Sequence, residues 1–426
     1  MSYIEKTVAL TGEKYYFMHH SSGADIIVIP KDFVTTYALF ATKYGSVDRT
    51  FKTDKDDDYI TVPDGVAHFL EHKLFENEDG EDTFARYARF GGSANAYTSF
   101  EKTAYLFSCT ENFGENFEIL LDFVQKPFFS EETVKKEQGI IGQEIKMYDD
   151  MPSWCVFFNM LSALYKNHPV AVDIAGTVES ISQITPEILY RCYNTFYNLN
   201  NMVICVCGNV TPEQIEKIAD KMLKKSEVVK VSVKQPEEPS EINFPSITKN
   251  MDVSMPLYSI GIKQQPALTT EEKIKAYAEY EILMQMFIGR CSDFYSELYE
   301  NNIISGGCGA SYEAFRDVAY ISISGSADDP QKVYDAIIGE MKARRENFYT
   351  VDEFERAKKI VYSSDIFSLD STEEIANDVL GFYMEGIDAF DMTEATAKVT
   401  YDDIKARFDM ALVPEKTVIS VIMPNA

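Results

Sequence analysis

"YTSFEKTAY" (residues 97–105) returns about half a chain later as "YEAFRDVAY" (residues 312–320). Two tyrosines, a phenylalanine and an alanine recur at the same spacing in both stretches. A second pair follows in the same order, "FFSEETVKKEQGII" (128–141) and "FYTVDEFERAKKIV" (348–361). Chance similarity between aromatic strands is the alternative, but two ordered pairs favour an internal duplication.

Strands and helices are grouped in blocks within each copy. Apolar runs typical of strands open and close each copy, and patterns typical of helices lie between them. These strand-like runs are "ADIIVIP" (24–30), "TTYALFATKYG" (35–45), "NMVICVCGNV" (201–210), "YSIGIKQQ" (258–265) and "TVISVIMP" (417–424). Grouped elements favour an α+β fold over a doubly wound parallel sheet. We therefore predict two homologous domains, each a mainly antiparallel sheet packed with helices.

A linker is expected between the two copies. The stretch 226–250 has three prolines, many charges and only weak periodicity, as linkers do. We place the linker at 226–244. A first domain is thus predicted at 1–225 and a second at 245–426.

Composition excludes several classes of function. The net charge of -28 argues against a protein that follows nucleic-acid phosphates. No apolar run reaches the length of a membrane span, and the N-terminus lacks the pattern of a signal peptide. The seven cysteines show no metal-binding spacing and are expected to be reduced thiols. We therefore expect a cytoplasmic protein that contacts neither nucleic acid nor membrane.

Three ionisable residues stand on one face of a predicted core helix, in "DGVAHFLEHKLFE" (64–76). His68 and His72 are one helical turn apart and Glu71 lies between them. Apolar residues occupy most other positions of this helix, and Asp64 is available as its N-terminal cap. Buried imidazoles and carboxylates need partners, because an unpaired polar group in a core is costly.

A zinc ion would supply such partners, since zinc accepts two imidazoles and a carboxylate and leaves a position for water. The third ligand is expected in "TVKKEQGIIGQEIKMYDD" (133–150), where Glu137 and Glu144 share a helical face with Ile140 and Ile141. We predict Glu144 as the third ligand and Glu137 behind it, orienting a histidine. Histidines satisfied within the core are the ordinary alternative.

These residues resemble the pitrilysin/insulinase-like zinc peptidases, in which His-x-x-Glu-His is followed much later by a glutamate ligand. His68, Glu71 and His72 match this motif directly, and Glu144 and Glu137 fit the distal glutamates. The stretch 91–108 is similar to the family's Gly-Gly-x-x-Asn-Ala-x-Thr segment. The likeness extends over essentially the whole chain and is greatest to small bacterial processing-peptidase-like members.

The resemblance implies two homologous halves that enclose a chamber, and zinc as the cofactor. It implies a substrate peptide that pairs as an added strand beside Asn95 and Ala96. Zinc lowers the pKa of its water to about 7, and Glu71 takes the proton as hydroxide attacks the peptide carbonyl. The predicted function is a zinc endopeptidase that acts on short or unfolded peptides.

The second copy lacks the metal site. His168 is the last histidine of the chain, and Ala357 and Ser364 stand opposite Glu137 and Glu144. One active site per chain is therefore predicted.

Active single-chain relatives also supply Arg-x6-Tyr from the second half, but here Tyr299 and Gly306 occupy these positions. The resemblance implies a dimer, in which a homologous chain carries the missing pair. A homodimer, or substitution of the pair by Tyr299 or Tyr312, is the alternative.

Two other functions stay open. The chain could be a peptide-binding or structural subunit of a two-chain peptidase, with weak or no activity of its own. Hydrolysis of a non-peptide amide is the third possibility. The intact Glu71 favours a peptidase over a structural subunit, because a structural zinc site needs no uncoordinated carboxylate and usually has four protein ligands.

Overall fold

The computed structural model describes residues 3–8 and 12–425. The chain forms two compact units, and each unit takes segments from both sequence halves. The first unit is Met1–Ile145, Asp173–Gln235 and Ser368–Met384, and the second is Lys146–Val172, Pro236–Phe367 and Glu385–Ala426. The predicted domains, 1–225 and 245–426, are continuous in sequence, whereas each compact unit combines several segments. The predicted boundaries therefore describe the sequence repeat and stay a prediction.

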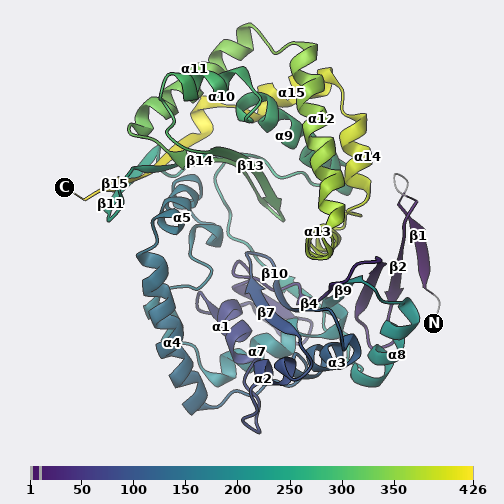
Figure 1. Cartoon of the computed structure of the whole chain (residues 1–426). Helices are drawn as coiled ribbons and strands as arrows, with labels where there is room; N and C mark the ends of the chain where they lie inside the picture. Colours follow the sequence, from purple (N-terminus) through teal and green to yellow (C-terminus); the bar gives the residue numbers. More distant parts are fainter. Residues whose placement is uncertain (1–2, 9–11, 426) are drawn as a thin grey trace. The chain divides into compact units, whose positions relative to one another are not determined.

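The first unit contains most of the elements from the first half of the chain (Figure 1). Its strands are β1 (Ile4–Thr7), β2 (Lys14–His19), β3 (Asp25–Pro30), β4 (Thr36–Thr42), β5 (Thr50–Thr53), β6 (Ile60–Thr61), β7 (Ser93–Thr98), β8 (Thr103–Cys109), β9 (Met202–Gly208) and β10 (Val231–Val233). Its helices are α1 (Val66–Lys73), α2 (Thr83–Ala88), α3 (Phe113–Phe123), α6 (Val178–Ile181), α7 (Pro186–Phe196), α8 (Pro212–Met222) and α13 (Thr372–Met384). Helix α4 (Glu131–Asp149) begins in this unit and ends in the other.

The second unit is built from the remaining elements. Its strands are β11 (Ser246–Met251), β12 (Leu257–Lys263), β13 (Cys308–Phe315), β14 (Val318–Ser326) and β15 (Thr417–Pro424). Its helices are α5 (Pro152–Leu164), α9 (Thr270–Ile288), α10 (Asp293–Glu300), α11 (Pro330–Glu346), α12 (Val351–Phe367), α14 (Asp391–Lys398) and α15 (Tyr401–Ala411).

The second main sheet has the topology of the part of the first sheet from β3 to β7. The first has the order β1-β2-β3-β9-β4-β8-β7, and the second has the order β11-β15-β12-β14-β13. In the first sheet β3 and β9 are parallel, and in the second β11 and β15 are parallel, while the other neighbours are antiparallel. The repeated stretches form the corresponding hairpins, β7–β8 and β13–β14. The predicted α+β class with two similar, mainly antiparallel sheets is confirmed.

Alternation along the strands of the first sheet gives it two buried faces. Ala38 and Phe40 of β4 belong to one hydrophobic core with Phe69 and Leu70 of α1. Tyr37, which directly precedes Ala38, points to the opposite face and is also buried. Helix α13 lies against β4 and β9 and covers this opposite face.

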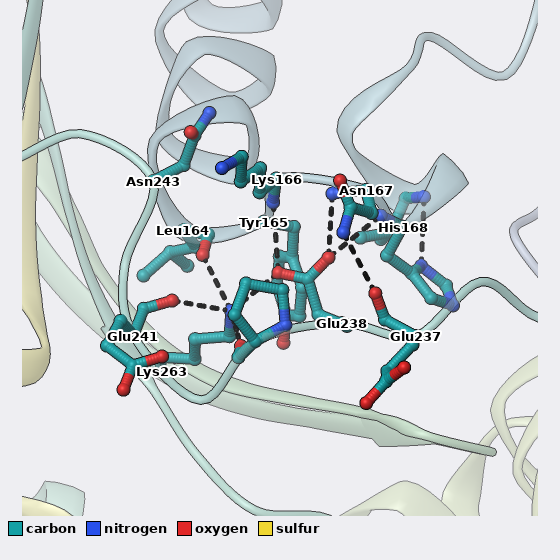
Figure 2. A network of polar contacts seen from close by, with 12 residues as sticks. Leu164, Tyr165, Lys166, Asn167, His168, Glu237, Glu238, Glu241, Asn243 and Lys263 are labelled. Carbon is teal, nitrogen blue, oxygen red and sulfur yellow. Dashed lines mark hydrogen bonds and ion pairs between the residues drawn. The ribbon is translucent and has the colours of Figure 1, made fainter.

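Residues of the predicted linker (226–244) are held within structure. Strand β10 pairs with β5 in the first unit. In the second unit, Lys263 is 4% exposed, and its ammonium donates to Glu238 at 2.7 Å and to the carbonyls of Leu164 and Glu241 at 3.0 Å. Figure 2 shows this lysine at the centre of the network. The segment 237–241 is therefore fixed to β12 and is not a free connection.

The same network holds the end of α5. The carboxylate of Glu238 accepts hydrogen bonds from the backbone amides of Lys166, Asn167 and His168 at 2.7 to 2.9 Å (Figure 2). The Lys263 ammonium lies 4.7 Å from the centre of the Tyr165 ring. A buried charge is tolerated when it is paired and hydrogen-bonded in this way.

Two expectations from composition bear on location. Among the described residues, no helix combines the length and the apolar character that a membrane crossing needs. All seven cysteines are free, and Cys291 alone among them is exposed.

Candidate active site

Helix α1 begins at a left-handed residue. Gly65 occupies the N-cap position with a φ of 91°. A Cβ at this position would lie 2.4 Å from the carbonyl oxygen of Ala175, so only glycine fits. The prediction that Asp64 caps the helix is wrong. The N-cap position is occupied by Gly65, which has no side chain to cap the helix. The carboxylate of Asp64 instead pairs with Arg49 at 2.7 Å.

Helix α1 is buried on most sides, as the sequence predicted. Val66, Phe69 and Leu70 are at most 2% exposed, and His68 is 8% exposed. The Tyr105 hydroxyl lies 3.4 Å from the carbonyl oxygen of Leu70 and 2.9 Å from the Tyr197 hydroxyl. This support from β8 and from Tyr197, just after α7, fixes the helix that carries the two histidines.

Helix α4 presents the two glutamates. Glu137 is 6% exposed, and Ile141 next to it on the same face is fully buried. The prediction that Ile140 shares this inward face is wrong, since Ile140 is 46% exposed. Ile140 and Ile141 lie on opposite sides of the direction of Glu137, about 100° apart, and only the side of Ile141 is covered.

Both histidines meet Glu144. The carboxylate oxygen Oε2 of Glu144 lies 3.3 Å from Nε2 of His72 and 3.7 Å from Nε2 of His68. Three potential ligand atoms, one from each residue, lie within 4.8 Å of one another. Nδ1 of His72 hydrogen-bonds to Oε1 of Glu137 at 3.0 Å. The structure thus brings together the four residues that the sequence predicted for a metal site.

The electrostatics of the cluster favour a cation. Burial and the neighbouring His72 lower the pKa of His68 to about 4, so its imidazole is neutral. Burial also opposes charge on His72, but hydrogen bonds to Glu137 and Glu144 outweigh it and raise its pKa to about 10. In the protein alone, a proton on His72 therefore provides the positive charge that the two carboxylates require.

The donor set fits zinc. Two imidazoles and one carboxylate are the protein ligands of many catalytic zinc sites, and zinc would replace the proton on His72. Nδ1 of His68 is buried and has no hydrogen-bond partner in the described part of the chain. The carboxylate of Glu137 would hold the ring of His72 in position for the metal.

Glu71 stands beside this cluster with a different partner. Its Oε2 accepts a hydrogen bond of 2.6 Å from the hydroxyl of Thr98 on β7. Burial raises the pKa of Glu71, and the bond from Thr98 opposes that rise. Sequence reasoning included Thr98 in a family-like segment but assigned it no role. The alternation of β7 could have placed Thr98 on the face of the sheet that packs against α1. The pairing of Thr98 with Glu71 could not be predicted, because the two residues are far apart in sequence.

Asn95 and Ala96 lie on the outermost strand of the first sheet. In the order of the sheet, β7 pairs with β8 on one side and ends the sheet on the other. The amide of Ala96 donates to the side-chain oxygen of Asn95 at 2.9 Å. An edge amide satisfied only by a neighbouring side chain can exchange that bond for one to an added strand.

The second unit carries no comparable cluster among the described residues. Ala357 is buried, and Ser364 is exposed. Tyr312 is 4% exposed and stacks on Tyr280 with ring centres 3.8 Å apart, so its side chain is part of the core of its unit. Tyr299 on α10 is 60% exposed. Of the two proposed substitutes for the missing tyrosine, only Tyr299 is accessible.

Two family models match the chain. Residues 59–178 match the model described as "Insulinase (Peptidase family M16)", and residues 183–361 match "Peptidase M16 inactive domain". The first match contains all the candidate metal ligands and Glu71. The second covers most of the repeat that lacks ligands.

Several known proteins are similar to this chain, and some of them match nearly all of it. An "uncharacterized zinc protease YmfH" of Bacillus subtilis is 37% identical over 97% of both chains. A probable mitochondrial-processing peptidase subunit beta of Arabidopsis thaliana is 26% identical over 53% of this chain and 43% of its own. A crystal structure of a putative M16-like peptidase from Alicyclobacillus acidocaldarius superposes with a TM-score of 0.92 at 32% identity, covering 100% of this chain and 99% of the other.

Proposed function

This chain belongs to the insulinase family of zinc peptidases, family M16, and from that premise we propose that it is an endopeptidase for short or unfolded peptides. The observation that carries the proposal is the position of Glu71. Its carboxylate lies next to His72 in the helix yet binds Thr98, so it is free of the proposed metal ligands. A structural zinc site does not require an uncoordinated carboxylate next to its ligands.

We propose His68, His72 and Glu144 as the metal ligands and Glu137 as the residue that orients His72. When bound, zinc supplies a Lewis acid that makes water acidic enough to deprotonate near neutral pH. Glu71 then accepts the proton from water and returns it to the departing amine. Thr98 holds the carboxylate of Glu71 in place for both transfers.

The substrate is proposed to bind along β7. Its backbone would pair with the open edge of β7, replacing the bond between the amide of Ala96 and the side chain of Asn95. Strand pairing uses the backbone and requires an extended peptide, so it suits unfolded chains of varied sequence. A folded protein segment would first have to unfold to bind in this way.

A second chain is proposed to complete the site. Tyr299 and Gly306 stand where related active chains carry arginine and tyrosine, and Tyr312 is buried in its own unit. Removing one hydrogen-bond donor from an oxyanion site costs about 100- to 1000-fold in rate. We therefore infer a dimer with a homologous chain that carries this pair. The name of the processing peptidase relative also describes a subunit.

We propose the cytoplasm as its location. Seven free cysteines suit a reducing compartment.

Glu71→Gln and His72→Ala together test the proposed chemistry. Glu71→Gln should keep zinc and lower hydrolysis of an internally quenched peptide by about 100-fold or more. His72→Ala should lose both zinc and hydrolysis. Glu78→Gln, an exposed neighbour in the chain, is the matched control and should behave as wild type. Peptide cleavage that survives in Glu71→Gln would show that the base is wrongly assigned.

Assays with and without a second chain separate the two candidate functions. A turnover of about 1 per second or more by the isolated chain would contradict the need for a partner. A chain that binds zinc and peptide but cleaves nothing, even with its partner, would instead be a peptide-binding subunit. The intact Glu71 favours the enzyme.

A further inference from the structure

Helix α13 belongs to the unit that holds the candidate site, although it comes from the half of the sequence that lacks metal ligands. Its apolar residues Ile375, Ala376, Val379 and Leu380 are buried. It lies against β4 and β9 on the face of the sheet opposite α1. A segment of the second half thus completes the scaffold behind the site.

Asn377 is the polar residue at this contact. Its side-chain oxygen accepts a hydrogen bond of 3.0 Å from the hydroxyl of Tyr97. Its amide nitrogen donates to the carbonyl oxygen of Glu373 at 2.9 Å and lies 3.4 Å from the hydroxyl of Tyr37. One side chain therefore links the edge strand β7 to the central strand β4 and to the helix itself.

Tyr97 is next to the residue that holds Glu71. Adjacent residues of a strand point to opposite faces, so Tyr97 faces α13 while Thr98 faces α1. Burial raises the pKa of Tyr97, so its hydroxyl remains a donor to Asn377 near neutral pH. An edge strand is paired on one side only, and it needs such an anchor more than a central strand does.

We propose that Asn377 is a positioning residue for catalysis, acting through Tyr97 and Thr98 on the carboxylate of Glu71. The inference rests on the proposed function, since it requires Glu71 to be the base. Asn377 binds Tyr97 and so fixes β7 on one face of the sheet. Thr98, the next residue of the fixed strand, binds Glu71 on the opposite face. The half of the chain without ligands thereby contributes to the chemistry of the site.

Asn377→Leu removes the bond to Tyr97 and keeps the branching of the side chain. We assay the full-length variant together with the proposed homologous partner chain. Asn377→Leu should lower kcat for the quenched peptide by about 10- to 100-fold, while its zinc content stays at the wild-type level. Asn377→Asp keeps an acceptor for Tyr97 and should restore kcat to within about threefold of wild type. Glu374→Gln, exposed on the same helix, is the matched control and should leave kcat unchanged.

A double-mutant comparison shows whether Asn377 acts through Thr98. Thr98→Val removes the hydroxyl that binds Glu71, and Asn377→Leu should cause little further loss in that background. If the two losses multiply fully, Asn377 acts elsewhere and the inference is overturned. Wild-type kcat in Asn377→Leu also overturns it.

Hydrogen exchange provides a readout that does not require activity. In zinc-free protein, the amides of β7 should exchange about tenfold faster in Asn377→Leu and in Tyr97→Phe than in wild type. Unchanged exchange in both variants would contradict the anchoring role. Tyr97→Phe also carries the test if Asn377→Leu fails to fold. Activity that persists in Glu71→Gln would instead reject the proposed function, so the two failures are distinguishable.

Discussion

His72 and Glu137 are joined by a hydrogen bond of 3.0 Å between Nδ1 and Oε1, which leaves Nε2 of the ring directed at Glu144, 3.3 Å away. The two glutamates of α4 therefore hold one imidazole from opposite sides. A histidine fixed in this way has one nitrogen committed to a carboxylate and the other available to a metal.

Removing the carboxylate of Glu137 should weaken zinc binding. Glu137→Gln keeps an acceptor for Nδ1 but loses the charge, and we expect about a 10-fold loss of zinc affinity; Glu137→Leu should cost about 100-fold. Competition with a chromophoric chelator measures both. Glu132→Gln, exposed on the same helix, is the control. Wild-type affinity in Glu137→Leu would show that His72 needs no such support.

Gly65 should tolerate no side chain. A Cβ would lie 2.4 Å from the carbonyl oxygen of Ala175, and the φ of 91° adds strain. Gly80 also has a positive φ, 74°, but open space around it, so Gly80→Ala measures the backbone cost alone, about 1 to 2 kcal/mol. Gly65→Ala should cost about 2 kcal/mol more and lower zinc affinity, because α1 must shift. Equal thermal stability of the two variants would contradict this.

The candidate metal site could be predicted largely from local patterns. The spacing of His68 and His72 and the helical period of Glu137 and Glu144 each identify one face of one helix. The shared need of buried polar groups for partners then joins the two helices. The same reasoning failed for Asp64 and Ile140. The helix begins one residue later than expected, at Gly65, and Ile140 lies at the edge of the inward face, where its side chain is exposed.

The supporting contacts could not be predicted. Asn377 meets Tyr97, and Lys263 meets Glu238, only because the fold brings distant segments together. Neither side chain belongs to a motif, and a single polar residue in a helix or strand is usually solvated. The duplication predicted that the two sheets match. It did not predict that α13, from the second half of the sequence, belongs to the first unit, or that α5, from the first half, belongs to the second unit.

Lys263 should be essential for the stability of the second unit. Lys263→Met keeps the length of the side chain but leaves the partly buried carboxylate of Glu238 without its cation. Breaking one side of a fully buried ion pair costs about 3 to 5 kcal/mol, and because Glu238 is partly exposed we expect a smaller loss here, about 2 to 3 kcal/mol. Lys332→Met provides the control, because Lys332 pairs with Asp329 on the surface and should cost less than about 1 kcal/mol. Urea unfolding compares the two, and similar midpoints would contradict a structural role for the network.

The pairing of Glu238 with Lys263 should make stability depend on pH. Burial opposes the charge on Glu238, but the bond from Lys263 and the amides of Lys166 and Asn167 outweigh it and lower its pKa. A carboxyl whose pKa is lower in the folded state stabilises the fold above the pKa of the unfolded chain, about 4.5, and this contribution is lost as pH falls through the folded pKa.

Glu238→Gln isolates this dependence. The variant should be less stable than wild type at pH 7, because the charge pair is lost, and the difference in urea midpoint should shrink as the pH falls below about 4.5. Other carboxyl groups titrate in both proteins and cancel in the difference. In the Lys263→Met background the pH-dependent part of the difference should be smaller, since the main attraction that lowers the pKa of Glu238 is gone. A difference that stays constant from pH 7 to pH 4 would mean that Glu238 titrates alike in the folded and unfolded chains.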